Sequence, residues 1–218
     1  MLLFLLPYSK KQRSISFKNC TDGRFEIKEL EPFARRVEGA SSNSLAPLHR
    51  RFAGPFWESL ELWALPTRVV EYIKEKTFVL SPVYGLLKPT ACIPYLPVGW
   101  EEKHGEVKLL DLWRRVLRPF SRELLQGKVV LPLLPKAHLS LFDLSWAERV
   151  VKFEYYTKDQ KVKNPYRHYA YTLRYVAERA LEPEDFGRIN FYDYRVEAIE
   201  HEGKVTLVRF RSEGRYEL

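Results

Sequence analysis

The chain opens on an uninterrupted apolar run, Leu2–Leu6, which Pro7 ends. A strand with one face in water alternates polar and apolar residues, so an unbroken run of this length indicates a strand covered on both faces. The run is too short for a signal peptide and lacks a basic segment before it. No stretch of the chain approaches the roughly 18 apolar residues that span a bilayer. We therefore expect a central strand at the start of the chain, and no membrane partner.

The other predicted elements follow one another without strict alternation. Helical periodicity occurs in residues 56–76 (interrupted at Pro66), 106–118 and 165–181. Strand patterns occur in residues 78–80 and 129–134, and in two hairpins at 150–162 and 189–211. Residues 39–44 have the composition of an exposed loop. Because 218 residues suit one large domain, we expect a mixed α/β (α+β) fold, with residues 1–218 forming a single compact domain around a mixed sheet.

The charge balance is basic: 36 Lys and Arg against 28 Asp and Glu give a formal charge of +8. An excess of this sign favours a polyanionic partner such as nucleic acid or a phosphorylated ligand, although many soluble proteins are equally basic without one. The excess is concentrated in residues 152–179, with seven basic and three acidic side chains. The composition excludes an acidic disordered chain and a low-complexity chain.

The two cysteines, Cys20 and Cys92, form neither a C-x-x-C motif nor a zinc-ligand spacing with the histidines. One disulfide is compatible with this count. In a reducing cytoplasm, however, two buried free thiols are the expected state. We expect no metal site and no cofactor.

The helix at 165–181 places Arg167, Tyr171 and Arg174 on one face. Guanidinium groups interleaved with tyrosines suit phosphates and stacked bases. The alternative is a solvated face with an Arg174–Glu178 pair worth a few tenths of a kcal/mol. These three residues are candidates for nucleic-acid binding.

Two loops add further candidates. In the segment Leu80–Pro89, Tyr84 precedes Gly85, whose lack of a side chain allows a tight turn close to a ligand, and Lys88 follows. Free amides and a lysine can hold a phosphate, although an ordinary β-turn explains the same residues.

The second loop contains Ser9, Lys10 and Lys11 and directly follows the first strand. Ligands often bind at the carboxyl ends of sheet strands, but lysines there also serve simply as solubilising charge.

Sequence motifs that are typical of enzymes are largely missing. The chain has no G-x-S-x-G, Walker A or H-E-x-x-H motif. His168 lies among tyrosines and basic residues, where either a general base or a structural histidine fits. The catalytic residues are therefore unknown, and the sequence leaves open whether the protein is an enzyme.

Three blocks of the chain resemble the YaaA family, the peroxide-stress proteins. They are Leu2–Ser9, then Leu80–Pro89 with Ile93–Tyr95, and then the order of Leu112-Trp113, the strand 129–134, the basic hairpin and helix, and the turn Glu182–Glu184. Two departures stand out. Pro132, Leu134 and Pro135 replace the family's Asn-x-Ala-Ser stretch, and Tyr166–Ala170 replace its Gly-rich basic segment.

The resemblance implies a positively charged cleft and a helix-hairpin-helix-like element that binds DNA, which would fall at Tyr84, Gly85 and Lys88. It also implies a role in limiting oxidative damage linked to iron. The leading hypothesis is thus a cytoplasmic peroxide-stress protein, favoured as a monomer, that binds double-stranded DNA largely without sequence preference. The alternatives are an enzyme acting on a phosphorylated or nucleobase-containing small molecule, and a scaffold with a basic surface and no site.

Overall fold

The predicted central strand is present and organises the fold. In the computed structural model, which describes residues 1–20, 23–39, 44–216 and 218, strand β1 (Leu2–Leu6) is buried along its whole length. It pairs in parallel with β3 on one side and with β8 on the other. Residues 40–43 of the predicted loop at 39–44 lie outside the described residues.

The strands after β1 are β2 (Leu45–Pro47), β3 (Thr77–Ser81), β4 (Gly85–Leu87), β5 (Cys92–Pro94), β6 (Lys103–His104), β7 (Val107–Lys108), β8 (Val129–Pro132), β9 (Arg149–Thr157), β10 (Gln160–Lys161), β11 (Asn190–Phe191), β12 (Tyr194–Glu202) and β13 (Val205–Ser212). The α-helices are α1 (Glu31–Glu38), α2 (Leu48–Arg51), α3 (Pro55–Leu60), α4 (Thr67–Lys76), α5 (Leu109–Leu125), α6 (Lys136–Leu139) and α7 (Tyr166–Arg179). Short 3-10 helices occupy Leu62–Ala64, Leu144–Trp146 and Pro183–Arg188.

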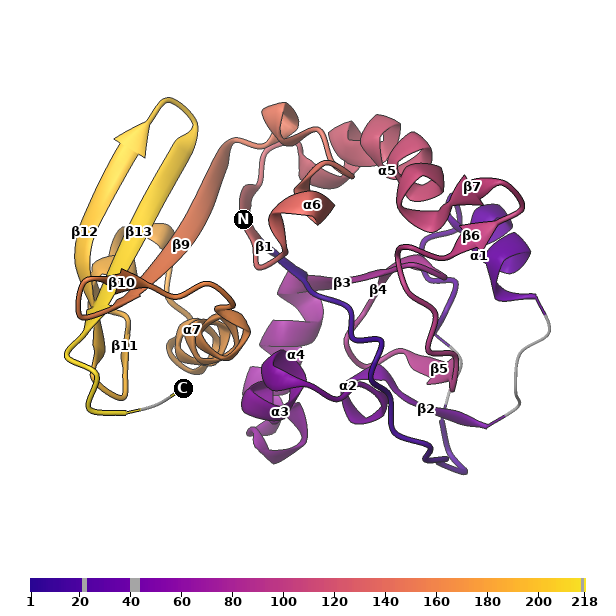
Figure 1. Cartoon of the computed structure of the whole chain (residues 1–218), viewed down its shortest axis with the longest axis horizontal. Helices are drawn as coiled ribbons and strands as arrows, with labels where there is room; N and C mark the ends of the chain where they lie inside the picture. Colours follow the sequence, from indigo (N-terminus) through magenta and orange to yellow (C-terminus); the bar gives the residue numbers. More distant parts are fainter. Residues whose placement is uncertain (21–22, 40–43, 217) are drawn as a thin grey trace.

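In the described chain, one mixed sheet of nine strands runs in the order β11-β12-β13-β9-β8-β1-β3-β4, with β10 paired to β9. Helix α5 lies above β1 and β3 in Figure 1, and α3, α4 and α7 lie below them. The core is continuous from β1 to the C-terminal strands. The predicted fold class, a mixed α/β domain, is therefore confirmed.

One local prediction was wrong in its bounds. The helical periodicity expected over residues 106–118 corresponds to α5, which begins at Leu109 and continues through Pro119 to Leu125. No helix in the described part of the chain combines the length and the apolarity that crossing a bilayer requires.

The segment that resembles the family's DNA-binding element forms the β3–β4 hairpin, in which two antiparallel strands flank the turn. Gly85 has a φ of +73°, which favours glycine, and a methyl group added there would lie 2.5 Å from Cζ3 of Trp113. Trp113 in turn donates its indole N–H to the carbonyl of Pro82 at 2.8 Å. The glycine is therefore required by packing against α5. Within the described chain, β-strands and not helices border this turn.

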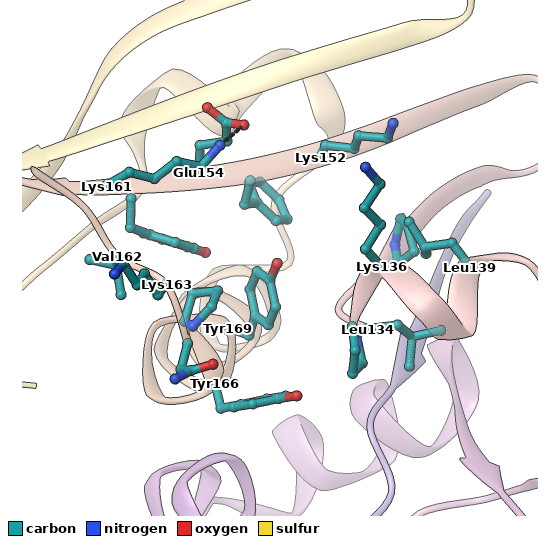
Figure 2. Close-up of a pocket in the computed structure, with 16 residues that line it drawn as sticks. Leu134, Lys136, Leu139, Lys152, Glu154, Lys161, Val162, Lys163, Tyr166 and Tyr169 are labelled. Atoms are coloured by element: carbon teal, nitrogen blue, oxygen red, sulfur yellow. Dashed lines mark hydrogen bonds and ion pairs between the residues drawn. The ribbon is translucent and has the colours of Figure 1, made fainter. Parts of the chain in front are cut away.

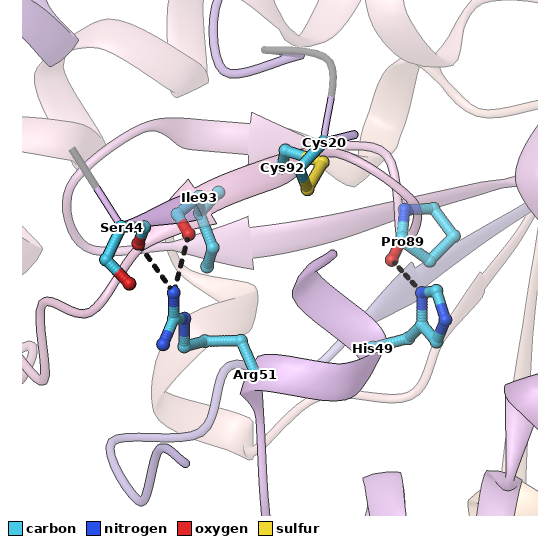
Figure 3. Close-up of a disulfide and its surroundings, with 7 residues drawn as sticks. All are labelled: Cys20, Ser44, His49, Arg51, Pro89, Cys92 and Ile93. Carbon is cyan, nitrogen blue, oxygen red and sulfur yellow. Dashed lines mark hydrogen bonds between the residues drawn. A yellow bond between two sulfur atoms is a disulfide. The ribbon is translucent and has the colours of Figure 1, made fainter. Parts of the chain in front are cut away.

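The expectation of free thiols was also wrong. Cys20 and Cys92 form a disulfide, with Cα atoms 5.8 Å apart. Figure 3 shows the bond together with the side chain of Arg51, which is fully buried and binds the carbonyl of Ile93, the residue after Cys92. Arg51 donates to the carbonyls of Arg13 (2.9 Å), Ser44 (2.8 Å) and Ile93 (3.3 Å). The sequence spacing of 72 residues gave no sign of this pairing, because only the folded β5 brings the two sulfur atoms together.

The contact between Gly85 and Trp113 generates a stability prediction. Gly85→Ala adds a methyl group into a buried indole and strains a positive φ, so we expect the free energy of unfolding to fall by about 3 kcal/mol. Gly105→Ala is the matched control, because Gly105 has a φ of +60° with nothing within 4 Å of the added methyl. It should cost only about 1 kcal/mol of backbone strain. Urea unfolding of both variants measures the difference, and equal losses would contradict the packing role of Gly85.

Candidate functional site: a lysine cavity beside β8

In the loop after β1, two of the three predicted residues, Ser9 and Lys10, interact with other parts of the protein. Lys10 forms ion pairs with Glu101 (3.0 Å) and Glu102 (2.9 Å), which raise its pKa. Ser9 donates its hydroxyl to backbone carbonyls, among them that of Ala53. Lys11 is exposed.

The predicted residues of the β3–β4 hairpin also have internal partners. Tyr84 is buried and donates its hydroxyl to Glu38 at 2.8 Å, and burial is the main cause of its raised pKa. Lys88 donates to the carbonyls of Glu75 and Thr77, both at 3.3 Å. Its ammonium group also lies 3.9 Å from the ring centre of Phe78. Burial lowers the pKa of Lys88.

On α7, the three predicted residues differ in accessibility. Arg174 pairs with Glu61 at 3.1 Å and with Glu178 at 3.8 Å, the pair expected under the alternative of a solvated face. Tyr171 accepts a hydrogen bond from the hydroxyl of Tyr192 at 3.2 Å. Arg167 is exposed and forms no ion pair among the described residues.

The structure keeps the nine predicted residues in three groups: the loop after β1, the β3–β4 hairpin and α7. Among the described residues, no hydrogen bond, ion pair or ring contact joins one group to another. Their joint role in one binding surface stays a prediction.

A cavity of about 450 Å³ lies where β8 and β9 separate. The ladder between these strands contains only Val129↔Arg149 and Val130↔Val150. Beyond it, the residues after β8 turn into α6, while β9 continues toward β10 and α7. These segments form the walls, which Figure 2 shows in close-up. We call this site the lysine cavity, because Lys136, Lys152, Lys161 and Lys163 line it.

Three of these lysines have no acidic partner. Lys161 forms an ion pair with Glu154. Burial alone would raise the pKa of Glu154, but Lys161 outweighs it and the pKa is lowered. No ion pair involves Lys136, Lys152 or Lys163 among the described residues, and all three are exposed. Figure 2 shows Lys136 of α6 and Lys152 of β9 reaching toward each other. An anion between such ammonium groups relieves their mutual repulsion.

The wall opposite these lysines is aromatic. Tyr166 and Tyr169 project from the first turns of α7. The ring of buried Tyr155, which also lines the cavity, lies 5.8 Å from that of Tyr169. Burial raises the pKa of Tyr169 to about 12 and also raises that of Tyr166. Both phenols are therefore neutral at physiological pH, and each offers a hydroxyl donor and a flat ring.

The backbone of β9 contributes polar groups as well. On the cavity side, β8 pairs with β9 only at Arg149 and Val150, and β10 pairs only at Tyr156 and Thr157. Tyr155 turns its carbonyl to this side, where it accepts from Val162 at 2.8 Å. Residues two apart on a strand point the same way, so Phe153 directs its backbone N–H into the cavity region. No strand in the described chain pairs with it there.

Part of this site could be predicted from the sequence. Three of the four lysines belong to the basic excess in residues 152–179. Pro132, Leu134 and Pro135, where the chain departs from the family pattern, line the cavity, as does Tyr166. No sequence pattern indicated that Lys136 lines the cavity, because its position depends on how the chain turns after β8.

His168, a candidate general base in the sequence, is only 3% exposed. Its ring packs against Tyr194 and Tyr155, with centroids 4.6 and 4.9 Å away. Neither ring nitrogen has a hydrogen-bond partner among the described residues. Burial, assisted by Arg167, lowers its pKa to about 4. The geometry favours a structural role for His168 over the role of a general base.

The cavity walls can bind an anion and stack a ring. No group of three or more His, Cys, Asp or Glu side chains in the described chain is arranged to hold a metal ion. The chemistry that the cavity offers is therefore ammonium groups, phenol hydroxyls and a strand edge.

The burial of His168 predicts a pH dependence of stability. Its pKa is about 4 in the folded protein and about 6.5 when unfolded. The unfolded chain therefore binds more protons between these values, and stability falls as the pH drops from 6.5 to 4. The loss amounts to about 3 kcal/mol. His168→Phe should remove this part of the pH dependence in unfolding measured from pH 4 to 7, and an unchanged profile would argue against a buried neutral imidazole.

Comparison with known proteins identifies the family. The family model described as peroxide stress protein YaaA matches residues 10–199, so the chain belongs to that family. No curated protein matches the sequence.

Proposed function

We propose that this member of the peroxide stress protein YaaA family binds the phosphate backbone of DNA at the lysine cavity, and so protects it from oxidative damage linked to iron. The observation that carries the proposal is that Lys136, Lys152 and Lys163 line one cavity and form no ion pair among the described residues. The cations predicted from the sequence at Lys10, Lys88 and Arg174 are engaged within the protein. Three unpaired lysines around one cavity supply positive charge for a polyanion.

The chemistry of these groups favours binding without sequence preference. Lysine acts on phosphate as a flexible point charge, whereas bidentate arginine contacts are typical of base recognition. Arg167 is exposed on the turn of α7 that carries Tyr166, and it extends the cationic surface beyond the cavity. We therefore include Arg167, one of the nine predicted residues, in the proposed binding surface.

A second candidate is a phosphorylated or nucleobase-containing small molecule. A volume of about 450 Å³ lies within the range of small-ligand pockets. The rings of Tyr166 and Tyr169 can stack a base while the lysines hold its phosphate. This candidate predicts saturable binding of a nucleoside monophosphate that competes with DNA.

The salt dependence of DNA binding tests the proposal. Each lysine–phosphate contact contributes about −0.9 to the slope of log K against log salt concentration. Lys136→Ala/Lys152→Ala should therefore reduce the magnitude of the slope by about 2 and weaken binding about equally on all sequences. Fluorescence anisotropy with two unrelated duplexes at several salt concentrations measures both effects.

Lys103→Ala/Lys108→Ala is the matched control. It removes the same charge from exposed lysines of β6 and β7, which lie far to the right of β9 in Figure 1. We expect little change in the slope. If both double variants reduce the slope equally, only net charge matters, and the cavity is not the binding site.

A further inference from the structure

We propose that Cys20 and Cys92 are a redox-active pair, which hydrogen peroxide oxidises from two thiols to the disulfide. The bond fastens residues 23–30 against the β3–β4 hairpin. This modification site is separate from the lysine cavity, and the proposal does not depend on nucleic-acid binding. It rests on how the two sides of the bond are held.

The Cys92 side is fixed without the disulfide. Strand β5 pairs with β2 through three residue pairs, and Cys92 itself lies opposite Pro47. The buried guanidinium of Arg51 binds the carbonyl of Ile93, next to Cys92, and those of two other segments. Contacts other than the disulfide therefore hold Cys92 in place on β5.

The Cys20 side connects to the turn that contains Tyr84. Three residues after Cys20, a methyl group added to Gly23 would lie 3.2 Å from Cα of Ala91. The backbone at Gly23 therefore packs closely against Ala91, the residue before Cys92. The Phe25 ring packs edge-on to Tyr84, with centroids 6.2 Å apart. Arg24 forms an ion pair with Glu38, which also accepts a hydrogen bond from the hydroxyl of Tyr84. Breaking the disulfide thus removes the covalent anchor beside this set of contacts.

The two sulfur atoms differ in accessibility. Cys92 is 5% exposed, whereas Cys20 is partly exposed. The Cys20 thiolate therefore attacks one oxygen of hydrogen peroxide and breaks the O–O bond, which yields a sulfenic acid and a hydroxide that is protonated to water. The Cys92 thiolate then attacks the Cys20 sulfur, the S–S bond forms, and the sulfenic hydroxyl leaves as a second water. In sum, two thiols and one peroxide give one disulfide and two waters.

Two considerations support this oxidation chemistry. The chain belongs to a peroxide stress family, so peroxide is the relevant oxidant. In reducing compartments, a disulfide that forms transiently is the typical redox device, whereas a permanent one is rare. The Cα spacing of 5.8 Å allows the bond to form without moving β5.

Thiol counting on the full chain tests the oxidation. The protein is reduced with dithiothreitol, freed of reductant, titrated with hydrogen peroxide, and alkylated for mass spectrometry. We expect both thiols to disappear for each peroxide consumed, with formation of the Cys20–Cys92 disulfide. Thiols that stay reduced, or a Cys20 that proceeds to sulfinic acid without the bond, would overturn the proposal.

Two single variants test the order of the steps. In Cys92→Ser, peroxide should leave a Cys20 sulfenic acid that a dimedone probe labels. In Cys20→Ser, Cys92 should stay a thiol under the same treatment. Labelling of Cys92 in place of Cys20 would contradict the assignment of the attacking sulfur.

Hydrogen exchange of the wild-type protein in both states tests the structural effect, and it needs no variant to fold. On oxidation, amide exchange in residues 23–30 and in the β3–β4 hairpin should slow at least tenfold, while exchange in β8 stays the same. Unchanged exchange in residues 23–30 would overturn the effect on this segment. Loss of protection in β8 on reduction would mark the bond as one that the fold requires, and would overturn its role as a switch.

Discussion

The burial of β1 on both faces is the constraint on which the rest of the structure depends. Five consecutive apolar side chains remain out of water only if helices cover both sides of the strand and other strands pair with both its edges. Strands β3 and β8 supply those pairs, both parallel to β1. Their carboxyl ends therefore face the same edge of the sheet. There β8 separates from β9, and the gap between them becomes the lysine cavity.

Three lysines that line one cavity and form no ion pair among the described residues favour it as the proposed binding site. The cations predicted from the sequence at Lys10, Lys88 and Arg174 instead bind carboxylates or carbonyls of the protein. Of the cavity lysines in the described chain, Lys161 has such a partner, Glu154. An exposed ion pair stabilises a protein by no more than about 1 kcal/mol, so leaving three lysines unpaired costs the fold little. The unpaired lysines produce a positive potential that attracts an external anion.

The sequence predicted the elements better than the places where they meet. Local patterns identified β1, α7 and both late hairpins. The basic stretch 152–179 and the departures at Pro132 and Tyr166 contribute residues to the wall of the cavity. The Cys20–Cys92 bond and the internal partner of Lys10 were missed. Both depend on tertiary contacts, over 72 and about 90 residues, that no local pattern encodes.

The cavity and the disulfide are separate in the molecule, one beside β8 and the other on β5, so anion binding and peroxide oxidation can be examined one at a time. The central claim concerns the unpaired lysines. Its most direct test is acylation of lysine amines, read by mass spectrometry with and without duplex DNA. Lys136, Lys152 and Lys163 should be protected by the DNA, while Lys103 and Lys108 should react as before. Protection of Lys10 and Lys88 instead, or of none of these lysines, would contradict the account.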